Sequence, residues 1–517
     1  MQFKLSSTMT QDTNVPDTTH PDSTNSTPKF TSEEFATFLK KKGFIYPSSA
    51  IYGGLAGLYD YGHLGTKVKH NFQNLWRKYF LSLNQNFYEI ETSNIAAEGV
   101  FKASGHLENF TDPVAISEDG HFERADHLLE KELGQRFEGL TNQEMMDLIK
   151  KHNIKCPKTG TNIVEVKHVN MMFPVSLGVG KSHTAYLRPE TAQSPFINFK
   201  TQFEIQRKKL PMGLAIIGRA YRNEISPRNL TLRQREFTQA ELQIFFNPEK
   251  IQQHENWDDI EYYELNTVLV EDRKTNKITK RTAKDLLALG LPKFYVYHLA
   301  IIQKFYLEVL KINPEKFRLY QLNDKEKAFY NRFHFDLETD LTAHGWTEVG
   351  GLHYRTDHDL KGHQNISKEK MEVMDESTQS KCLPHVLELS FGVDRNVFTI
   401  LDHAYQNEKD RGNIVMQLKQ NITPFTAAVF PLVKNKEPIV NKAKEVLKIL
   451  KDANISSFYD KASSIGKRYA RADEIGIKWG ITIDFDSLDD NCITIRNRDT
   501  TEQERIKITE LLSFLKQ

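Results

Sequence analysis

The segment that most constrains the fold runs from residue 218 to residue 246, GRAYRNEISPRNLTLRQREFTQAELQIFF. Two apolar-rich runs flank a polar stretch that contains Pro227 and Asn229, which predicts two antiparallel strands joined by a long loop. Successive side chains of a strand point to opposite faces, so one face of the second strand is apolar and can pack on a core. The other face carries a guanidinium, an aromatic ring, two amides and a carboxylate: Arg235, Phe237, Gln239, Glu241 and Gln243.

A polar face alone is equally typical of an ordinary half-buried strand. The first strand favours a binding site, because Arg222 and Glu224 share a face at its end and the loop adds Arg228 and Arg233. Arginine suits the oxyanion of a phosphate, and a flat aromatic ring suits a base. The segment therefore predicts a nucleotide bound on an antiparallel sheet.

Several motifs then resemble one family. RNEISPRN followed by REFTQAELQIFF resembles motif 2 of class II aminoacyl-tRNA synthetases, specifically the dimeric glycyl-tRNA synthetases. RPETAQ, RTDHDL and ELSFGVDR occur in the order of that family, and IYGGLAGLYDYGHLG resembles its motif 1. The resemblance implies an α+β class II catalytic domain, an antiparallel sheet of six or seven strands flanked by helices, with a C-terminal α/β anticodon-binding domain. It also implies a homodimer that uses ATP to charge glycine onto its tRNA.

The composition indicates the number of domains and the cellular compartment, but it does not indicate the activity. The 517 residues are too many for one core. Lys and Arg total 69 against 68 Asp and Glu, so RNA binding would have to come from local patches. Three distant cysteines, Cys156, Cys382 and Cys492, exclude a disulfide framework, and no apolar run approaches a membrane span. We expect a cytoplasmic protein.

The chain divides into three predicted parts. Residues 1–29 are rich in Ser, Thr, Asn and Asp without arginine, which predicts a disordered tail rather than a mitochondrial transit peptide. Residues 30–420 form the expected catalytic core, with insertions at about 112–170 and 247–329. Residues 421–517 alternate strands and helices and look like the anticodon-binding domain that glycyl-, histidyl-, threonyl- and prolyl-tRNA synthetases share.

Two local patterns define the start of the core. Thr31 or Ser32 with Glu34 forms a helix-start signature, and Gly43 ends that helix. Apolar residues at helical spacing predict a long amphipathic helix from about 66 to 83.

Two patterns invite a metal, and neither is convincing. Cys156 lies in KCPKTG, which resembles half a zinc knuckle, but Thr159 stands where a second cysteine is needed and a structural zinc takes about four ligands. DHDLKGH offers Asp357, His358, Asp359 and His363, for which strand-end and loop roles are favoured. We expect no structural zinc and no dedicated metal, only Mg²⁺ with ATP, held by carboxylates that spacing does not reveal.

The resemblance assigns the nucleotide contacts. Arg222 would bind the α-phosphate, Phe237 would stack under adenine, and Glu224 would bind the adenine amino group. Arg395 would lie on the other side of adenine, near the γ-phosphate, so the two catalytic residues are Arg222 and Arg395. Glu388, in motif 3, borders the ATP site as well.

The amino-acid pocket follows from the same matching. An α-ammonium needs carboxylates and an α-carboxylate favours a bidentate arginine. The matching positions are Glu190, Glu241 and Glu388 with Ser390 for the ammonium, and Arg355 for the carboxylate. Glycine has no side chain to recognise, so selection would work by filling the space of a methyl group. We expect no editing domain.

Five basic residues are candidates for contact with tRNA, although solvated surface charge is the default for each one. They are Lys467, Arg468, Arg471, Arg496 and Arg498. Two alternatives stay open: a catalytically silent paralogue that binds RNA or a partner, and a synthetase for histidine, proline or threonine. The motif arginines argue against the first, and the three glutamates argue against the second.

Overall fold

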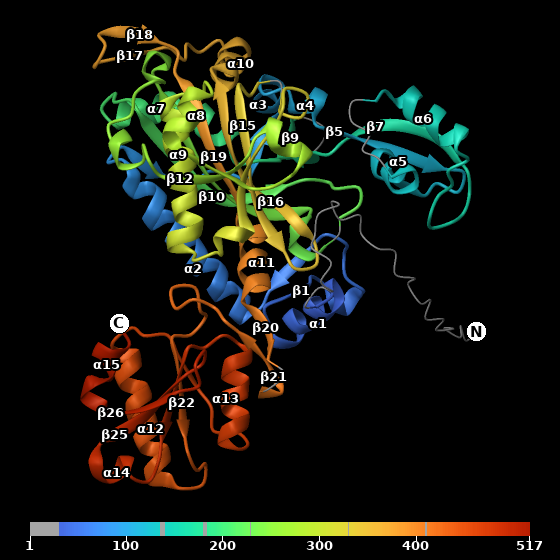
Figure 1. Cartoon of the computed structure of the whole chain (residues 1–517). Helices are drawn as coiled ribbons and strands as arrows, with labels where there is room; N and C mark the ends of the chain where they lie inside the picture. Colours follow the sequence, from blue (N-terminus) through green and yellow to red (C-terminus); the bar gives the residue numbers. More distant parts are fainter. Residues whose placement is uncertain are drawn as a thin grey trace.

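The computed structural model describes residues 30–134, 140–178, 183–227, 229–328, 330–408 and 411–516. The predicted tail at 1–29 and Arg228 lie outside these residues. Figure 1 shows a large body built around one sheet, a small lobe beside it, and a separate C-terminal domain below.

The large body is organised by one central sheet. Its strands in spatial order are β13 (Thr279–Thr282), β12 (Glu264–Val268), β14 (Phe317–Gln321), β15 (Phe333–Leu341), β16 (Gly345–Thr356), β19 (His385–Gly392), β11 (Glu236–Phe246), β10 (Met212–Tyr221) and β3 (Phe87–Glu89). The pairs are antiparallel except β12–β14 and β3–β10. The predicted antiparallel sheet is confirmed at its centre, but the described residues give it nine strands instead of six or seven.

Helices cover the two faces of this sheet unequally. On one face, α2 (His63–Phe80), α9 (Lys293–Lys304) and α11 (Val393–Ala404) bury the main core, in which Trp76 and Phe80 contact Phe391. On the other face, α7 (Gln193–Ile205) and α10 (His358–Ser367) pack over one end of the strands. The rest of that second face is free to form a binding site.

The two local patterns near the start of the core are confirmed. Helix α1 (Ser32–Lys42) begins with a capping box between Thr31 and Glu34, and it ends at Gly43, whose φ of 79° is left-handed. Helix α2 starts three residues before the predicted 66, at His63. Gly65 lets this first turn approach the preceding chain, because a Cβ there would lie 2.0 Å from the carbonyl oxygen of Phe44.

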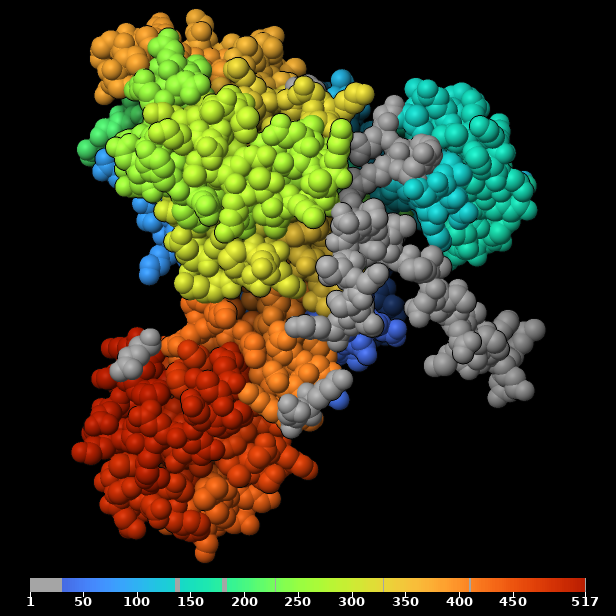
Figure 2. All heavy atoms as spheres, in the orientation of Figure 1, coloured from blue at the N-terminus to red at the C-terminus, as the bar shows by residue number. Residues whose placement is uncertain are grey.

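The first insertion is a small lobe with its own core, shown in teal beside the large body in Figure 2. It contains β5 (Thr111–Ser117), β6 (Phe122–Arg124), α5 (Ala125–Leu133), α6 (Asn142–Lys151) and β7 (Ile163–Asn170). The charged runs ADHLLEKEL and NQEMMDLIKK predict its two helices, whereas its strands are not predicted from the sequence. The second insertion is not a lobe, since β12, β13 and β14 extend the central sheet and α8 (Ala283–Ala288) packs beside α9.

The C-terminal domain is a five-stranded sheet between helices. The strand order is β23 (Ser457–Tyr459), β22 (Ala427–Pro431), β24 (Trp479–Ile483), β25 (Cys492–Asn497) and β26 (Gln503–Lys507). Helices α12 (Glu437–Asp452) and α13 (Ile465–Glu474) pack on opposite faces, in separate apolar clusters. The predicted α/β domain is confirmed, with β26 as an unpredicted strand and a short closing helix α15 (Leu511–Phe514).

Smaller elements connect these units. They are β1 (Ile45–Pro47), β2 (Tyr59–Tyr61), β4 (Ile95–Ala97), α3 (Glu98–Ala103), α4 (His106–Asn109), β8 (Phe173–Leu177), β9 (His183–Leu187), β17 (Val373–Asp375), β18 (Ser380–Cys382), β20 (Tyr405–Glu408), β21 (Asn413–Met416) and α14 (Ser487–Asp490). None of the described helices is long and apolar enough to cross a membrane.

Candidate functional site

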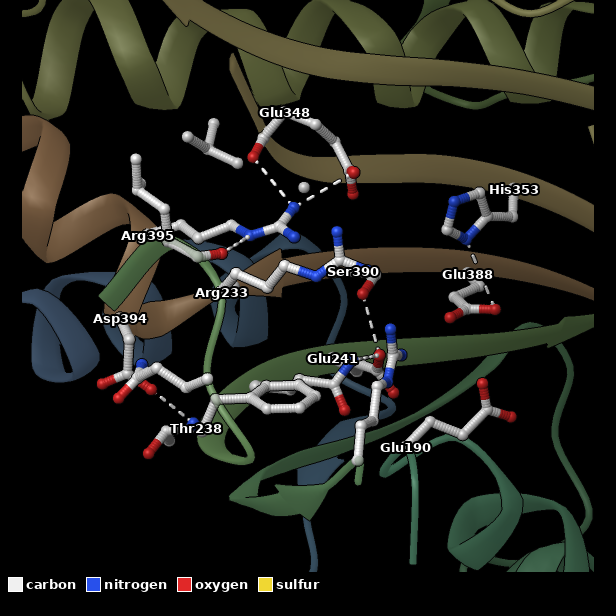
Figure 3. A pocket seen from close by; sticks show the side chains of 18 of the residues that line it. Glu190, Arg233, Thr238, Glu241, Glu348, His353, Glu388, Ser390, Asp394 and Arg395 are labelled. Carbon is white, nitrogen blue, oxygen red and sulfur yellow. Dashed lines mark hydrogen bonds and ion pairs between the residues drawn. The ribbon is translucent and has the colours of Figure 1, made fainter. Parts of the chain in front are cut away.

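One pocket on the open face of the central sheet collects the residues that the sequence assigned to ATP and glycine (Figure 3). Strand register explains why they meet: Glu241 on β11 lies opposite Ser390 on β19, and Gln243 lies opposite Glu388. All nine assigned residues line the pocket: Glu190, Arg222, Glu224, Phe237, Glu241, Arg355, Glu388, Ser390 and Arg395.

Glu241 is the buried carboxylate at the centre of the pocket. One of its oxygens accepts hydrogen bonds from Ser390 Oγ and Gln239 Nε2, both at 2.8 Å, and the other accepts from Thr191 Oγ1 at 2.7 Å. Burial, followed by the charges of Glu388 and Glu190, raises the pKa of Glu241 to about 8. Its charge is therefore incompletely compensated, and a bound cation would stabilise it.

The other two glutamates are compensated by protein cations. Burial opposes the charge of Glu388, but Arg355 and then His353 hold its pKa at about 2. Arg355 Nη1 donates to Glu388 at 2.6 Å. Burial also opposes the charge of Glu190, while His106 at 3.6 Å and Arg355 at 3.8 Å lower its pKa below the usual range. Two fixed negative charges thus border the titratable Glu241.

Arg355 is bonded to carboxylates of the protein. Its Nε and Nη2 donate to Asp359 at 2.7 and 2.8 Å, and its Nη1 donates to Glu388. The guanidinium also lies over the ring of Tyr330, at 4.6 Å. These bonds use three of the five N–H groups of the guanidinium, and the assignment of Arg355 to the substrate carboxylate stays a prediction.

The opposite end of the pocket combines an aromatic ring with arginines. Arg222 Cζ lies 5.1 Å from the centre of the Phe237 ring, and Arg222 Nε donates to the carbonyl oxygen of Pro189. Arg395 Nη1 pairs with a carboxylate oxygen of Glu348 at 3.0 Å, as Figure 3 shows. This end offers a stacking surface and positive charge to a planar, anionic ligand.

A buried lysine anchors the strand that carries Phe237. Lys69 on α2 donates to Thr238 Oγ1 at 2.8 Å and to Asp394 at 2.6 Å. Its pKa is lowered by burial, although Asp394 opposes that effect. Arg188 of the RPETAQ motif lies on the other face, beside Gly218 of β10, where its Nε donates to the carbonyl oxygen of Arg219 at 2.7 Å. Both cations support the site without lining it.

Some pocket residues were missed by the sequence analysis. Glu348 and His353 lie on β16 in the run WTEVGGLHYRT, where polar side chains in a strand were the available signal. Tyr330 and Asp394 also line the pocket, and Asp394 immediately precedes the predicted Arg395. Arg233, noted only as a loop cation, donates to Glu224 at 2.7 Å.

Comparisons with known proteins agree with this geometry. Residues 179–404 match the family described as the tRNA synthetase class II core domain (G, H, P, S and T), and residues 426–517 match the anticodon binding domain. A glycine–tRNA ligase of Pyrococcus abyssi is 36% identical, over 94% of this chain and 98% of that protein. One from Methanocaldococcus jannaschii is 34% identical over the same shares. The chain belongs to the glycine–tRNA ligase family.

The class II fold is also visible at the level of structure. A prolyl-tRNA synthetase from Cryptosporidium parvum superposes with a TM-score of 0.58 at 11% identity, covering 94% of this chain and 75% of that chain. The segment that matches the class II core contains all nine assigned pocket residues of this glycine–tRNA ligase family member. The predicted family and fold class are thereby confirmed.

The predicted RNA contacts on the C-terminal domain need correction. Arg468 is 1% exposed and donates to the carbonyl oxygens of Ala462 and Ser463. Arg498, 2% exposed, donates to those of Gly476 and Leu418. Arg496 is buried against Asp473, with bonds of 2.8 and 3.0 Å. These three arginines hold the domain together and cannot meet RNA in this arrangement.

The other two candidates remain available. Lys467 is exposed on α13, and Arg471 is partly exposed while paired with Asp460. Both lie on one helix of the anticodon binding domain, so a contact surface there stays a prediction.

The two patterns that invited a metal interpretation form no cluster of ligands in the part of the chain that the structure describes. Within the described residues, no group of three or more His, Cys, Asp or Glu side chains is arranged to hold a metal ion. Cys156 is a free, buried cysteine in the core of the small lobe. Asp359 of DHDLKGH is the partner of Arg355.

Proposed function

We infer that this chain activates glycine with ATP and transfers it to the 3' end of its tRNA. The observation that carries the inference is that one pocket contains both a group of three glutamates and an aromatic ring with arginines beside it. The first suits a small ammonium and the second a nucleotide, which are the two substrates of aminoacyl-adenylate formation.

At the glycine end, the ammonium would lie among Glu190, Glu241 and Glu388. Glu241 is held by three donors, so its position is fixed before the substrate arrives. A side chain larger than hydrogen would have to displace carboxylates that are themselves paired. Attraction for one methylene discriminates by only about 1–3 kcal/mol, whereas a clash with rigid walls rejects alanine more strongly.

At the nucleotide end, Phe237 would stack under the base and Arg222 would neutralise the phosphate at which the carboxylate attacks. Arg395 would contact the distal phosphates after its pairing with Glu348 loosens. Glu348 is the exposed carboxylate at this end, and oxygen ligands of that kind fit Mg²⁺. The ion would supply further neutralisation of the phosphates. Catalysis would then rest on positioning and charge.

Several finer assignments belong to the same proposal. We propose a homodimer, a cytoplasmic location, and tRNA contact through the C-terminal domain. The domain division proposed from sequence, with the catalytic core at 30–420 and the anticodon-binding domain at 421–517, is supported by a separate apolar core in each part.

The test is ATP–pyrophosphate exchange that depends on the amino acid, with glycine, alanine and serine. We expect exchange with glycine alone and its loss in Arg222→Ala, because the α-phosphate would lose its charge partner. Arg219→Ala, at an exposed arginine near the end of β10 and three residues before Arg222, is the matched control and should keep the exchange. No exchange with any amino acid would favour the catalytically silent paralogue.

A further inference from the structure

The motif DHDLKGH has no function in the pocket, yet the structure buries two of its residues beside it. Asp359 and His363 are four residues apart on α10, so both point from one face of that helix. Their exposed fractions are 2% and 4%. Neither lines the pocket, so their contacts have to explain why they are buried.

Both residues converge on Gln193, the first residue of α7. Gln193 Nε2 donates to Glu190 Oε1 at 2.8 Å and to Asp359 Oδ1 at 3.2 Å. His363 Nε2 lies 2.9 Å from Gln193 Oε1. A chain of contacts therefore runs from α10 through α7 to a carboxylate of the pocket.

The chemistry of the partners fixes the direction of each bond. Ionised carboxylates only accept, so the Gln193 atom that faces Glu190 and Asp359 must be the amide nitrogen. Gln193 Oε1 then faces His363 and can only accept, which makes His363 Nε2 the donor. Burial lowers the pKa of His363, which favours the neutral ring with its proton on Nε2.

We propose that Gln193 and His363 are positioning residues for glycine, in which His363 fixes the amide of Gln193 and that amide holds the carboxylate of Glu190 toward the ammonium. The same amide contacts Asp359, the bidentate partner of Arg355, which in turn holds Glu388. Two of the three glutamates would thus depend on one buried amide. This inference rests on the proposed glycine pocket.

Two substitutions of His363 can distinguish the loss of its hydrogen bond to Gln193 from a change in side-chain volume. The Nε2 atoms of glutamine and histidine are equally many bonds from the backbone, so His363→Gln retains a donor at that place. His363→Asn carries its amide nitrogen one bond closer and loses the contact. In glycine-dependent pyrophosphate exchange, we expect H363N to raise the KM for glycine about 5- to 20-fold, with H363Q within about twofold of wild type. The KM for ATP should stay unchanged in both.

His298→Asn is the matched control, because His298 is also buried but lies in α9, away from the pocket. It should leave both KM values unchanged. Gln193→Met removes the amide at similar volume and should reproduce the effect on glycine, which keeps the test decisive if H363N does not fold.

Glu190→Gln separates this inference from the pocket assignment. If E190Q raises the KM for glycine but neither H363N nor Q193M does, the positioning role is wrong. If E190Q itself leaves that KM unchanged, the proposed pocket is wrong. Equal increases for glycine and ATP in H363N would indicate a general structural defect and would also overturn the positioning role.

Discussion

Three glutamates in one buried pocket repel one another unless cations intervene, and this protein distributes its cations unequally. Arg355 bonds Glu388 and approaches Glu190. Among the ion pairs of the described residues, none involves Glu241, which has only neutral donors. The ammonium of a substrate would therefore supply the charge that Glu241 lacks.

Glycine binding should depend on pH through this residue. Because the pKa of Glu241 is about 8 without ligand, a proton has to leave before the carboxylate can pair with the ammonium at lower pH. We expect the KM for glycine to fall on the order of tenfold as pH rises from 6.5 to 8.5. The measurement is pyrophosphate exchange across this range, with the KM for ATP as internal control. Parallel changes in the two KM values would contradict the assignment.

Glu241→Gln should stabilise the fold while it abolishes glycine activation. The folded-state pKa of Glu241 exceeds its unfolded value, so the folded wild type binds the extra proton between about pH 4.5 and 8 and loses stability as pH rises through that window. Glutamine carries no charge to bury, so its advantage should grow from pH 5 to pH 8, reaching about 1–3 kcal/mol. Thermal unfolding at both pH values measures the difference. An advantage equal at both values would mean that charge is not the cause.

At the residue scale, the sequence predicted which side chains line the pocket, but it did not predict which of the glutamates are paired with a cation. Alternation along β11 placed Glu241 on the polar face, and the resemblance to the family assigned Glu190, Glu241 and Glu388 to one site. The sequence does not reveal which carboxylates Arg355 would neutralise, because Asp359 reaches it from α10 and Glu388 reaches it from β19.

At the scale of elements, the pocket depends on how closely β16 and β19 approach. A Cβ at Gly350 would lie 2.4 Å from the carbonyl oxygen of Ser390 and 3.0 Å from a methyl of Leu337. The first of these atoms is backbone, so it cannot rotate away. The glycine therefore sets the distance between the two strands at the residue that bonds Glu241.

Gly350→Ala should push these strands apart. We expect a loss of about 1–3 kcal/mol in the free energy of unfolding, with a raised KM for glycine because Ser390 moves. Gly466→Ala on α13 is the control, since no atom lies within 4 Å of a Cβ there, and it should be neutral or slightly stabilising. Thermal unfolding and pyrophosphate exchange give both readouts. An unchanged KM in a destabilised G350A would show that the Ser390 contact is dispensable.

Helices and strands that are marked by a local sequence pattern were predicted correctly. The capping box of α1 and the alternation of β11 are local patterns, and both gave correct elements. β5 and β26 were not predicted. TDPVAIS has a proline at its third position and QERIK has one apolar residue, so neither run shows a clear strand pattern before it pairs, β5 with β7 and β26 with β25. Sequence charge also misled on α13, where Arg468 and Lys467 are adjacent but only one faces solvent.

At the scale of the whole molecule, the C-terminal domain is joined to the core by apolar and polar contacts together. Ile422 is buried in the main core, and Phe425 and Ile475 pack against that core. Asn71 Nδ2 of α2 donates to the carbonyl oxygen of Thr423 at 2.9 Å, and Thr423 Oγ1 donates to that of Gly476 at 2.6 Å. Arg498 ties the domain to Leu418 in the linker. The buried Arg498 therefore helps to attach the domain to the core. Any contact with RNA would have to come from the exposed cations of the domain.

The corrected RNA surface makes a prediction about α13. Lys467→Glu reverses an exposed charge on this helix, so we expect the KM for tRNA to rise about 3- to 10-fold at low salt, and less at high salt, because phosphate contacts are screened. Glycine-dependent pyrophosphate exchange should not change, since the pocket lies in the other domain. Lys444→Glu makes the same charge change on α12, which packs on the opposite face of the sheet, and should leave the KM for tRNA near wild type. Equal effects of K467E and K444E would mean that net charge, and not a surface on α13, governs tRNA binding.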